Sequence, residues 1–404
     1  MSAVGPGRER GAAVADRPAE VMIYVQHLLG IGHLTRAASI ARACAAAGLS
    51  TALVSGGPPL PRLPLGEARL VQLPPLRSRD AAFSALVDAE GREIDEAFKA
   101  ERRARLLAAF EALAPRVLMI ELYPFGRRML RFELEPLVAA ARERSPRPWI
   151  LCSLRDVLNP SDNPKKADWT LERVRTAFDL VLVHGDPELA PLVASFPHAA
   201  AIADRLRYTG YVVAESQPAA DTAGVGDGEG EVLVSTGGGA VGQALIETAL
   251  AARERSPLRD RPWRILVGES LEAAAFERLR AAAPEGMIVE RARADFRALL
   301  ARARLSISQG GYNTVMEILQ AGLPAVVVPF ETAGEQEQRL RAELLAARGL
   351  LTLLPAERLA PDALAGAIGQ ALGAKAAVHN PVIDVAGASN TAKIVAELAA
   401  IVPD

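Results

Sequence analysis

The chain has 404 residues, a formal net charge of −2 and only two cysteines, Cys44 and Cys152. This length suits two α/β domains better than one core, and the near-neutral charge excludes a strong field that would attract nucleic acid. The cysteines cannot form a disulfide scaffold and the five histidines show no ligand spacing, so we expect no metal site and a cytoplasmic location. No run of about 18 apolar residues predicts a membrane span. The sequence is compatible with peripheral contact with a membrane surface.

The first half of the chain predicts a repeated strand–helix pattern. Residues 1–19 are rich in Gly, Ala, Arg and Asp without periodicity, which is typical of a disordered tail. An apolar run at 21–26, a glycine loop at 27–33, a helical period at 34–47 and a strand at 51–55 form a βαβ unit. Further strands are expected at 117–120, 149–153 and 180–184. We therefore predict an N-terminal, acceptor-side Rossmann-like domain over 20–216.

The second half repeats this pattern. A strand at 231–235 is followed by a glycine loop at 236–239 and a helix at 241–253, with further strands at 263–267, 287–290, 305–308 and 325–329. Residues 217–230 lack an apolar period and are predicted to be a linker, and 231–389 a second domain. The amphipathic helix at 390–402 is expected to pack back on the first domain. The prediction is an α/β fold of two doubly wound domains facing a central cleft, with ligands beyond the carboxyl ends of the strands.

The strongest motif follows the strand at 305–308. Gln309, Gly310 and Gly311 predict a tight turn, and Thr314 with Glu317 three residues later has the form of a helix-opening capping box. Backbone amides and the positive end of that helix would then hold a diphosphate without a metal, and Glu317 could accept two hydrogen bonds from a ribose. A capped helix with no ligand explains the same spacing equally well.

A second polar segment lies just downstream, at 335–342. It follows the strand at 325–329, so its side chains are expected at the same edge of the sheet. Glu337 and Gln338 offer an acceptor and a donor side by side, which suits sugar hydroxyls. The alternative is an ordinary charged helix start.

Residues 308–342 resemble the donor-binding half of glycosyltransferase family 28. The resemblance implies the GT-B fold and a UDP-sugar as co-substrate, with no other cofactor. It assigns Glu317 to the ribose, the amides near Gly311, Asn313 and Thr314 to the diphosphate, and Glu337 and Gln338 to the sugar. The loop containing Gly237, Gly238 and Gly239 resembles the other glycine turn of that domain. Arg341 stands where the family commonly has Asn, and Glu337 where Gln is found, which leaves the sugar open.

A further candidate site is the loop Gly30–Arg36. His33 stands beside Gly32 at a predicted helix start, where a small polar residue is usual, and a neutral imidazole there could take a proton from a hydroxyl or water. The helix end is expected to lower the pKa of His33, and Arg36 could steady a phosphate or carboxylate. The alternative is a partly buried histidine bonded to the backbone. The loop resembles the Gly-Gly-His loop of family 28 and, more closely, the loop of UDP-sugar hydrolases of pseudaminic acid synthesis.

Other candidates stand at strand ends of the first half. Glu121 begins a segment dense in polar and aromatic groups and is expected to orient His33 or bind acceptor hydroxyls. Asp156, after the strand at 149–153, is a candidate for the acceptor side, with turn capping as its alternative.

These patterns and the resemblance lead to one functional expectation and two alternatives. We expect an inverting, metal-independent glycosyltransferase that moves a hexosyl group, of the N-acetylglucosamine type, from a UDP-sugar to an unidentified acceptor. The acceptor could be a glycan, a lipid-linked sugar or a small molecule. The alternatives are a UDP-sugar hydrolase or epimerase, and a non-catalytic nucleotide-sugar binding protein. Oligomeric state is open.

Overall fold

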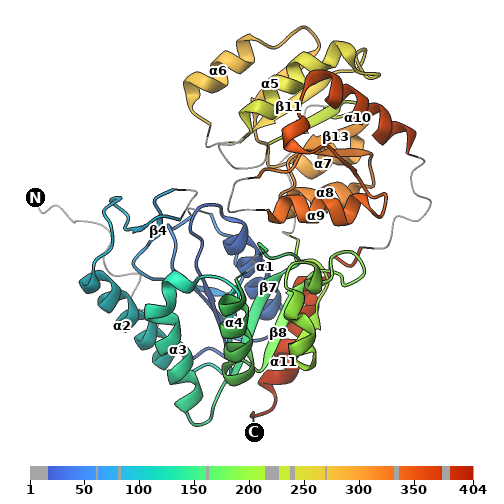
Figure 1. Ribbon diagram of the computed structural model, residues 1–404. Coiled ribbons are helices and arrows are strands. Elements are labelled where there is room, and N and C mark those ends of the chain that lie inside the picture. The colour runs from blue at the N-terminus through green and yellow to red at the C-terminus, as the bar shows by residue number, and fades with distance from the viewer. Residues whose placement is uncertain are drawn as a thin grey trace, which may run out of the picture. The chain divides into compact units, whose positions relative to one another are not determined.

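A computed structural model describes residues 17–60, 62–80, 83–160, 163–213, 227–236, 242–268, 271–331, 336–374 and 383–403. The chain divides into two compact units. Unit 1 comprises Met1–Asp186, Phe196–Ala214 and Val385–Asp404, and unit 2 comprises Pro187–Ser195 and Glu215–Asp384. Figure 1 shows that each unit contains a sheet with helices around it.

Unit 1 is built on one parallel sheet. Within the described residues its strand order is β3-β2-β1-β6-β7-β8-β9. The strands are β1 (Val21–Val25), β2 (Thr51–Ser55), β3 (Arg69–Gln72), β6 (Val117–Glu121), β7 (Trp149–Arg155), β8 (Leu180–His184) and β9 (Leu206–Tyr208). The helices are α1 (Gly32–Ala46), α2 (Glu96–Leu113), α3 (Arg131–Glu143), α4 (Pro164–Ala177) and α11 (Gly387–Ala399). A small hairpin pairs β4 (Arg77–Ser78) with β5 (Leu86–Val87).

The central strands of this sheet are continuous apolar runs. Every residue of β1 and β6 is buried, as expected for parallel strands that helices cover on both faces. The strand order reverses between β1 and β6, which pair with each other. Their carboxyl ends therefore form the switch point at which α/β sheets usually bind ligands.

The last helix of the chain belongs to unit 1. Helix α11 packs against α1, and the red α11 and blue α1 can be followed in Figure 1. Asn390 Nδ2 donates to the carbonyl of Thr209 (2.9 Å), and Gly387 N donates to the carbonyl of Tyr211 (3.1 Å). A side chain at Gly387 would lie 2.4 Å from the carbonyl oxygen of Gly210, so only glycine permits this approach.

Unit 2 has a second parallel sheet, of order β12-β11-β10-β13-β14-β15 within the described residues. The strands are β10 (Val232–Ser235), β11 (Trp263–Val267), β12 (Met287–Arg291), β13 (Leu305–Ser308), β14 (Ala325–Val327) and β15 (Thr352–Leu353). The helices are α5 (Gln243–Ala252), α6 (Ala273–Ala281), α7 (Phe296–Arg302), α8 (Tyr312–Ala321), α9 (Glu337–Ala346) and α10 (Pro361–Gly373). Its switch point lies between β10 and β13.

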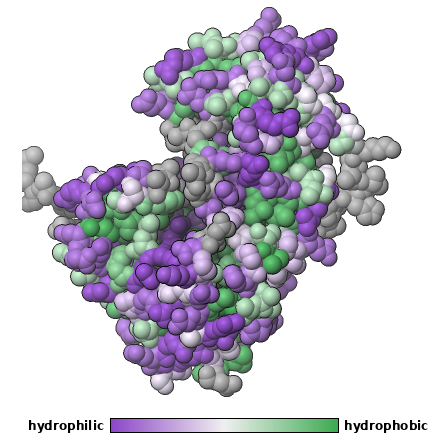
Figure 2. Space-filling view, in the orientation of Figure 1, coloured by the Kyte–Doolittle hydropathy of each residue, from purple (hydrophilic) through white to green (hydrophobic). Residues whose placement is uncertain are grey.

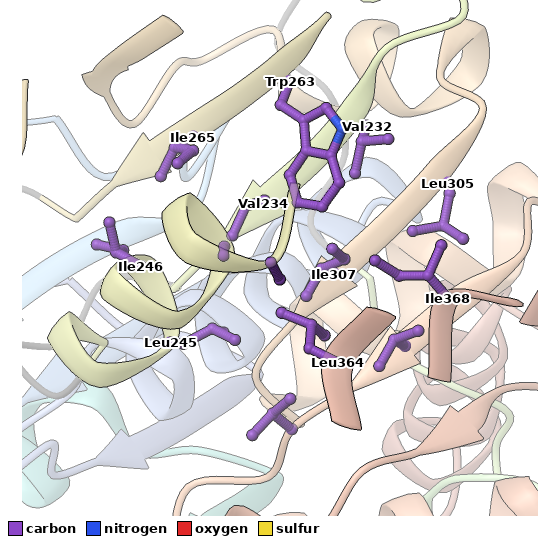
Figure 3. Close-up of a cluster of buried hydrophobic side chains, with 14 of the residues drawn as sticks. Val232, Val234, Leu245, Ile246, Trp263, Ile265, Leu305, Ile307, Leu364 and Ile368 are labelled. Carbon is purple, nitrogen blue, oxygen red and sulfur yellow. The ribbon is translucent and has the colours of Figure 1, made fainter. Parts of the chain in front are cut away.

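The core of unit 2 forms around Trp263. The indole is fully buried among aliphatic side chains of β10, β13, α5 and α10, as Figure 3 shows, and its Nε1 donates to the carbonyl of Leu258 (3.1 Å). Burying an aromatic ring of this size contributes on the order of 3 kcal/mol or more. The packing fixes β10 and β13, whose ends lead into the predicted glycine turns.

Several predicted boundaries are corrected by local contacts. Residues 17–19 of the predicted tail are ordered, because Ala19 N donates to the carbonyl of Leu113 (2.7 Å); residues 1–16 lie outside the described residues. Residues 227–230 of the predicted linker belong to unit 2, where Asp227 pairs with Arg264 (3.0 Å) and Arg293 (2.8 Å). Segment Pro187–Ser195 also clusters with unit 2 rather than unit 1.

The surface in the view of Figure 2 is mostly hydrophilic, with hydrophobic side chains in small patches. In the described parts of the chain, no helix combines the length and hydropathy that a bilayer crossing requires.

Candidate functional site

His33 and Glu121 meet at the switch point of unit 1. Glu121 is the last residue of β6, and His33 lies in the first turn of α1, which begins at Gly32. His33 Nδ1 is 2.8 Å from Glu121 Oε1, and the side chains are 14% and 0% exposed. The strand and the glycine loop thus bring together two residues that are 88 positions apart in the sequence.

This contact determines which nitrogen of His33 carries the proton. An ionised carboxylate can only accept hydrogen bonds, so the neutral ring satisfies this contact with its proton on Nδ1 and its lone pair on Nε2. Arg36 Nη2 lies 3.1 Å from the same Nδ1 and donates to the carboxylate instead. Among the described residues Nε2 has no hydrogen-bond partner. The geometry therefore presents an oriented, neutral imidazole whose Nε2 can accept a proton.

Burial and nearby charges keep both groups in these protonation states. Burial and the charge of Arg127 lower the pKa of His33 to about 3, against the opposing effect of the hydrogen bond that His33 donates to Glu121. Burial by itself would raise the pKa of Glu121, but Arg36 and His33 hold it well below its usual range. The sequence predicts a lowered pKa for His33, and burial and arginine charge act in that direction.

Arg36 forms an ion pair with Glu121. It is buried, and its Nη2 donates to Glu121 Oε1, so the carboxylate it steadies belongs to the protein. Glycine is not required by packing at Gly30 or Gly32, because a Cβ at either position would meet nothing within 4 Å. The loop before His33 therefore has free space beside its two glycines.

For two other residues of unit 1, Asp156 and Ser153, the structure gives a different position or role from the one predicted. Asp156, predicted on the acceptor side, is fully buried and packs against Gly185, where a Cβ would lie 2.9 Å from the Asp156 Cβ. The structure thus places Asp156 inside the unit. Sequence reasoning gave no role to Ser153, whose hydroxyl donates to Glu121 Oε2. Its place opposite Glu121 follows from the pairing of β6 with β7, which the sequence alone did not show.

In unit 2 the predicted turn leads directly into α8. The helix begins at Tyr312 with Gly311 as its N-cap, and no side chain caps it. The predicted capping box is therefore wrong: Thr314 lies in the first turn rather than at the N-cap. Asn313 and Thr314 are half-buried. Backbone amides at the start of an uncapped helix need an acceptor from outside it.

The two glycines of this turn have different structural reasons. A Cβ at Gly310 would lie 3.0 Å from the carbonyl oxygen of Gln338, so that glycine permits close packing against α9. A Cβ at Gly311 would meet nothing within 4 Å, and its φ of −62° suits any residue. Neither packing nor backbone geometry requires glycine at 311.

Glu317 does not cap the helix. Its Oε1 accepts from Arg297 Nε (3.0 Å), and burial raises its pKa against the opposing effect of that arginine. No partner of Oε2 is found among the described residues. One carboxylate oxygen of Glu317 is therefore held by α7, while the other remains available to a hydroxyl donor.

The predicted sugar-binding residues stand at the start of α9, and they differ in burial. Glu337 is the first residue of α9 and is buried. Gln338 Oε1 accepts from Phe330 N (3.1 Å), so its Nε2 is the atom left for a ligand. Arg341 is buried and its Nη1 donates to the carbonyl of Gly310 (3.0 Å), with its guanidinium 5.6 Å from the centre of the Tyr312 ring.

The remaining residues of the predicted donor site are the glycine turn at 237–239 and Gln309. The turn Gly237, Gly238 and Gly239 lies outside the described residues. Gln309, which follows β13, is half-buried, and its N donates weakly to the carbonyl of Ser235 (3.4 Å). Over the described ranges, no group of three or more His, Cys, Asp or Glu side chains could hold a metal ion.

Comparison with known proteins identifies the C-terminal part of the chain. Residues 232–393 match the family model "Glycosyltransferase family 28 C-terminal domain". The UDP-N-acetylglucosamine–N-acetylmuramyl-(pentapeptide) pyrophosphoryl-undecaprenol N-acetylglucosamine transferase of Nitrosococcus oceani is 34% identical over 135 residues, 33% of this chain and 37% of that protein. The enzyme of the same name from Chromobacterium violaceum is 34% identical over 208 residues, 46% of this chain and 56% of that protein. The chain thus spans less than two thirds of either relative.

Solved structures are similar over nearly the whole chain. The glycotransferase of kitacinnamycin has a TM-score of 0.64 at 16% identity, covering 96% of this chain and 100% of its own. MurG of Acinetobacter baumannii has a TM-score of 0.59 at 16% identity, covering 95% and 100%. These likenesses establish the fold of two Rossmann-like domains, known as GT-B. Residues 232–393 of this fold form a domain that matches the C-terminal domain of glycosyltransferase family 28.

Proposed function

We propose that this protein transfers a hexosyl group from a UDP-sugar to an acceptor hydroxyl, with His33 as the general base. The observation that carries the proposal is the His33–Glu121 pair, in a chain with a family 28 C-terminal domain. Direct attack by the deprotonated hydroxyl on the sugar inverts the anomeric centre, because a single displacement occurs. The N-acetylglucosamine transferases among the relatives make that type of sugar the first donor to test.

The geometry of unit 1 supports the role of His33. As the acceptor hydroxyl attacks, its proton passes to Nε2, and the imidazolium that forms remains hydrogen-bonded to Glu121 through Nδ1. A carboxylate in this position stabilises the positive charge that develops on the ring. Arg36 opposes that charge but also keeps Glu121 ionised.

The start of α8 supports the donor role of unit 2. The uncapped amides at this end carry positive potential, which would stabilise the diphosphate as it leaves the sugar. The open space at Gly311 permits a phosphate to approach the backbone closely. Glu317 Oε2 lies one turn further along and would accept from a ribose hydroxyl.

The proposal is tested by binding and turnover with the intact protein. Titration calorimetry with UDP should detect binding, and Glu317→Ala should weaken it by about 1–3 kcal/mol through loss of charge-assisted hydrogen bonds. His33→Ala should leave UDP binding unchanged while lowering turnover by about 10²–10⁴-fold. Absence of UDP binding would refute the donor site, and full activity of His33→Ala would refute the base.

A second candidate function rests on the same loop. The pattern Gly30–Gly32–His33–Arg36 resembles that of UDP-sugar hydrolases, and Nε2 of His33 could equally accept a proton from water. UDP released at turnover rates from UDP-N-acetylglucosamine alone would favour hydrolysis. UDP released only when an acceptor is added would support transfer, and binding without turnover would favour a non-catalytic role.

Gly311 offers a sharper test of the donor site. In Gly311→Ala the methyl group enters open space at an ordinary φ, so stability should be unchanged or raised by up to about 1 kcal/mol. If a phosphate lies against this backbone, UDP affinity should fall by roughly tenfold or more. Gly366→Ala on α10 is the matched control, because its Cβ also meets nothing within 4 Å. Equal UDP affinities for both variants would contradict the proposed phosphate position.

A further inference from the structure

A chain of buried hydrogen bonds leads from Glu121 into the interior of unit 1. The Ser153 hydroxyl donates to Glu121 Oε2, and Ser153 Oγ lies 2.9 Å from His184 Nε2. On the other side of the ring, His184 Nδ1 lies 2.8 Å from Thr209 Oγ1. Ser153, His184 and Thr209 are all at most 2% exposed, so all three lie in the interior of unit 1.

The register of the sheet brings these side chains together. Glu121 pairs with Ser153, and Ser153 with Leu182 on β8. His184 is two positions beyond Leu182 and therefore projects from the same face of β8. The chain crosses three adjacent strands at their carboxyl ends, directly behind the catalytic pair.

The proton positions along this chain follow from counting hydrogens. Glu121 is ionised, so the single hydrogen of the Ser153 hydroxyl goes to its Oε2. Ser153 Oγ can then only accept from His184, which requires a proton on Nε2 of that ring. Burial lowers the pKa of His184 to about 3, with a further contribution from Arg36, so the ring is neutral. With its proton on Nε2, Nδ1 is an acceptor, and the Thr209 hydroxyl at 2.8 Å donates to it in preference to the Gly210 carbonyl at 3.0 Å.

We propose that Ser153 and His184 are positioning residues for the transfer reaction, which fix Glu121 so that its Oε1 faces His33. The inference rests on the proposed role of His33 as base. Without the Ser153 hydroxyl, Glu121 Oε2 would be buried with no donor on that side, and the carboxylate could rotate or draw a proton. Without a donor at His184, the Ser153 hydroxyl would no longer be held with its hydrogen on Glu121.

The C-terminal helix holds Thr209, the last residue in this series of hydrogen bonds. Thr209 receives a hydrogen bond at its carbonyl oxygen from Asn390 of α11 (2.9 Å), and Val212 forms a β-bridge with Ala386. These contacts fix the backbone that carries the Thr209 hydroxyl. The C-terminal segment of the chain therefore supports the position of a base that lies more than 350 residues earlier in the sequence.

The first test reads the tautomers directly. Nitrogen-15 NMR of protein labelled at histidine distinguishes a protonated ring nitrogen from an unprotonated one. In the ligand-free protein near pH 7 we expect the proton of His184 on Nε2 and that of His33 on Nδ1, with the resonances assigned from the His184→Gln and His33→Gln variants. A proton on Nδ1 of His184 would overturn the inference, because Ser153 would then donate to the ring and not to Glu121.

The second test uses matched variants in turnover. Ser153→Ala should lower kcat by about tenfold or more, the loss expected for one charge-assisted hydrogen bond, and leave KM for the UDP-sugar within about twofold. His184→Gln keeps an N–H donor and should retain more of kcat than His184→Leu. Ser39→Ala, at a buried serine of α1 outside this chain, is the control and should match the wild type.

The outcomes separate this inference from the proposed function. These comparisons use variants whose thermal unfolding midpoint is unchanged. A wild-type kcat for Ser153→Ala would overturn the positioning roles while leaving His33 as the base. Equal kcat values for His184→Gln and His184→Leu would do the same. If the wild-type protein turns over no UDP-sugar, the proposed function fails. The tautomer measurement still decides the direction of the hydrogen bonds, because it needs no substrate.

Discussion

Replacing Glu121 by Gln is the most direct perturbation of the His33–Glu121 pair. The substitution keeps the shape of the side chain but removes its charge. The amide group can present its NH2 to His33 Nδ1, which would move the ring proton to Nε2 and take away the lone pair that accepts the proton. It also removes the anion that would stabilise the imidazolium formed in the proposed transfer.

The structure sets the size of the expected effect. His33 Nδ1 and Glu121 Oε1 are 2.8 Å apart, but both charges are delocalised, so a separation of about 4 Å between charge centres is the relevant one. At an effective dielectric constant of about 20 the attraction is about 4 kcal/mol, equivalent to roughly 10³ in kcat. The change of tautomer adds to this, and an amide substitution in a Ser-His-Asp triad lowers kcat by about 10⁴. We expect Glu121→Gln to lower kcat by about 10³–10⁴-fold.

The assay is steady-state release of UDP from the UDP-sugar under the conditions in which the wild type turns over. UDP affinity by calorimetry should be unchanged, because the predicted nucleotide site lies in unit 2. A thermal unfolding curve controls for stability, since Arg36 is buried beside the substituted group and loses its charged partner. A kcat within about threefold of the wild type would refute the assignment of Glu121 as the partner of a catalytic base.

Three other predictions follow from particular contacts. The pKa of His33 and of His184 is lowered from 6.5 to about 3. Below pH 6.5 the unfolded chain therefore binds protons that the folded protein does not. As the pH decreases from 6.5 to about 3, the free energy of unfolding should fall by up to about 1.4 kcal/mol per pH unit for each ring. Denaturant unfolding at several pH values should show a shallower fall for His184→Gln, and an unchanged slope would contradict the low pKa. Arg341→Met removes the donor to the carbonyl of Gly310 and should destabilise unit 2 by about 1.5–3 kcal/mol, measured by chemical unfolding, with weaker UDP binding as a result; unaltered stability would show that this bond does not hold the turn. Arg297→Gln frees Glu317 from its ion pair, so UDP affinity should change in this variant but not in Arg255→Gln, whose exposed pair with Asp362 lies elsewhere.

The fold could be predicted further than the site. Apolar runs bounded by glycine turns located β2, β8, β11 and β13 to the residue, because buried parallel strands leave a strong signal in the sequence. The edge strands β3, β9 and β15 were missed, since they are two to four residues long and partly exposed. The start of α8 was misplaced because Thr314 and Glu317 have the spacing of a capping box, whereas tertiary contact with Arg297 takes the carboxylate away from the helix end.

The site residues depended on pairing that a single sequence does not encode. His33 was selected because its position is unusual for a helix start, and Glu121 because of its polar surroundings. Their contact, and that of Ser153 with Glu121, exists only because β6 pairs with both β1 and β7. Asp156 also follows a strand, with turn capping as the favoured alternative, and its side chain packs inside the unit. Strand ends give candidates, and the register of the sheet selects among them.

The two units place different chemistry at the same point of their sheets. In unit 1 the switch point carries side chains, with an imidazole and a carboxylate whose ionisation is set by burial and arginine charge. In unit 2 it carries backbone, with an uncapped helix start at Gly311. A base must change its protonation state during reaction, which only a titratable side chain can do, whereas a diphosphate needs a constant positive potential, which fixed amides supply. Unit 1 should therefore be most sensitive to substitutions that alter charge, such as Glu121→Gln, and unit 2 to those that only add a methyl group, such as Gly311→Ala.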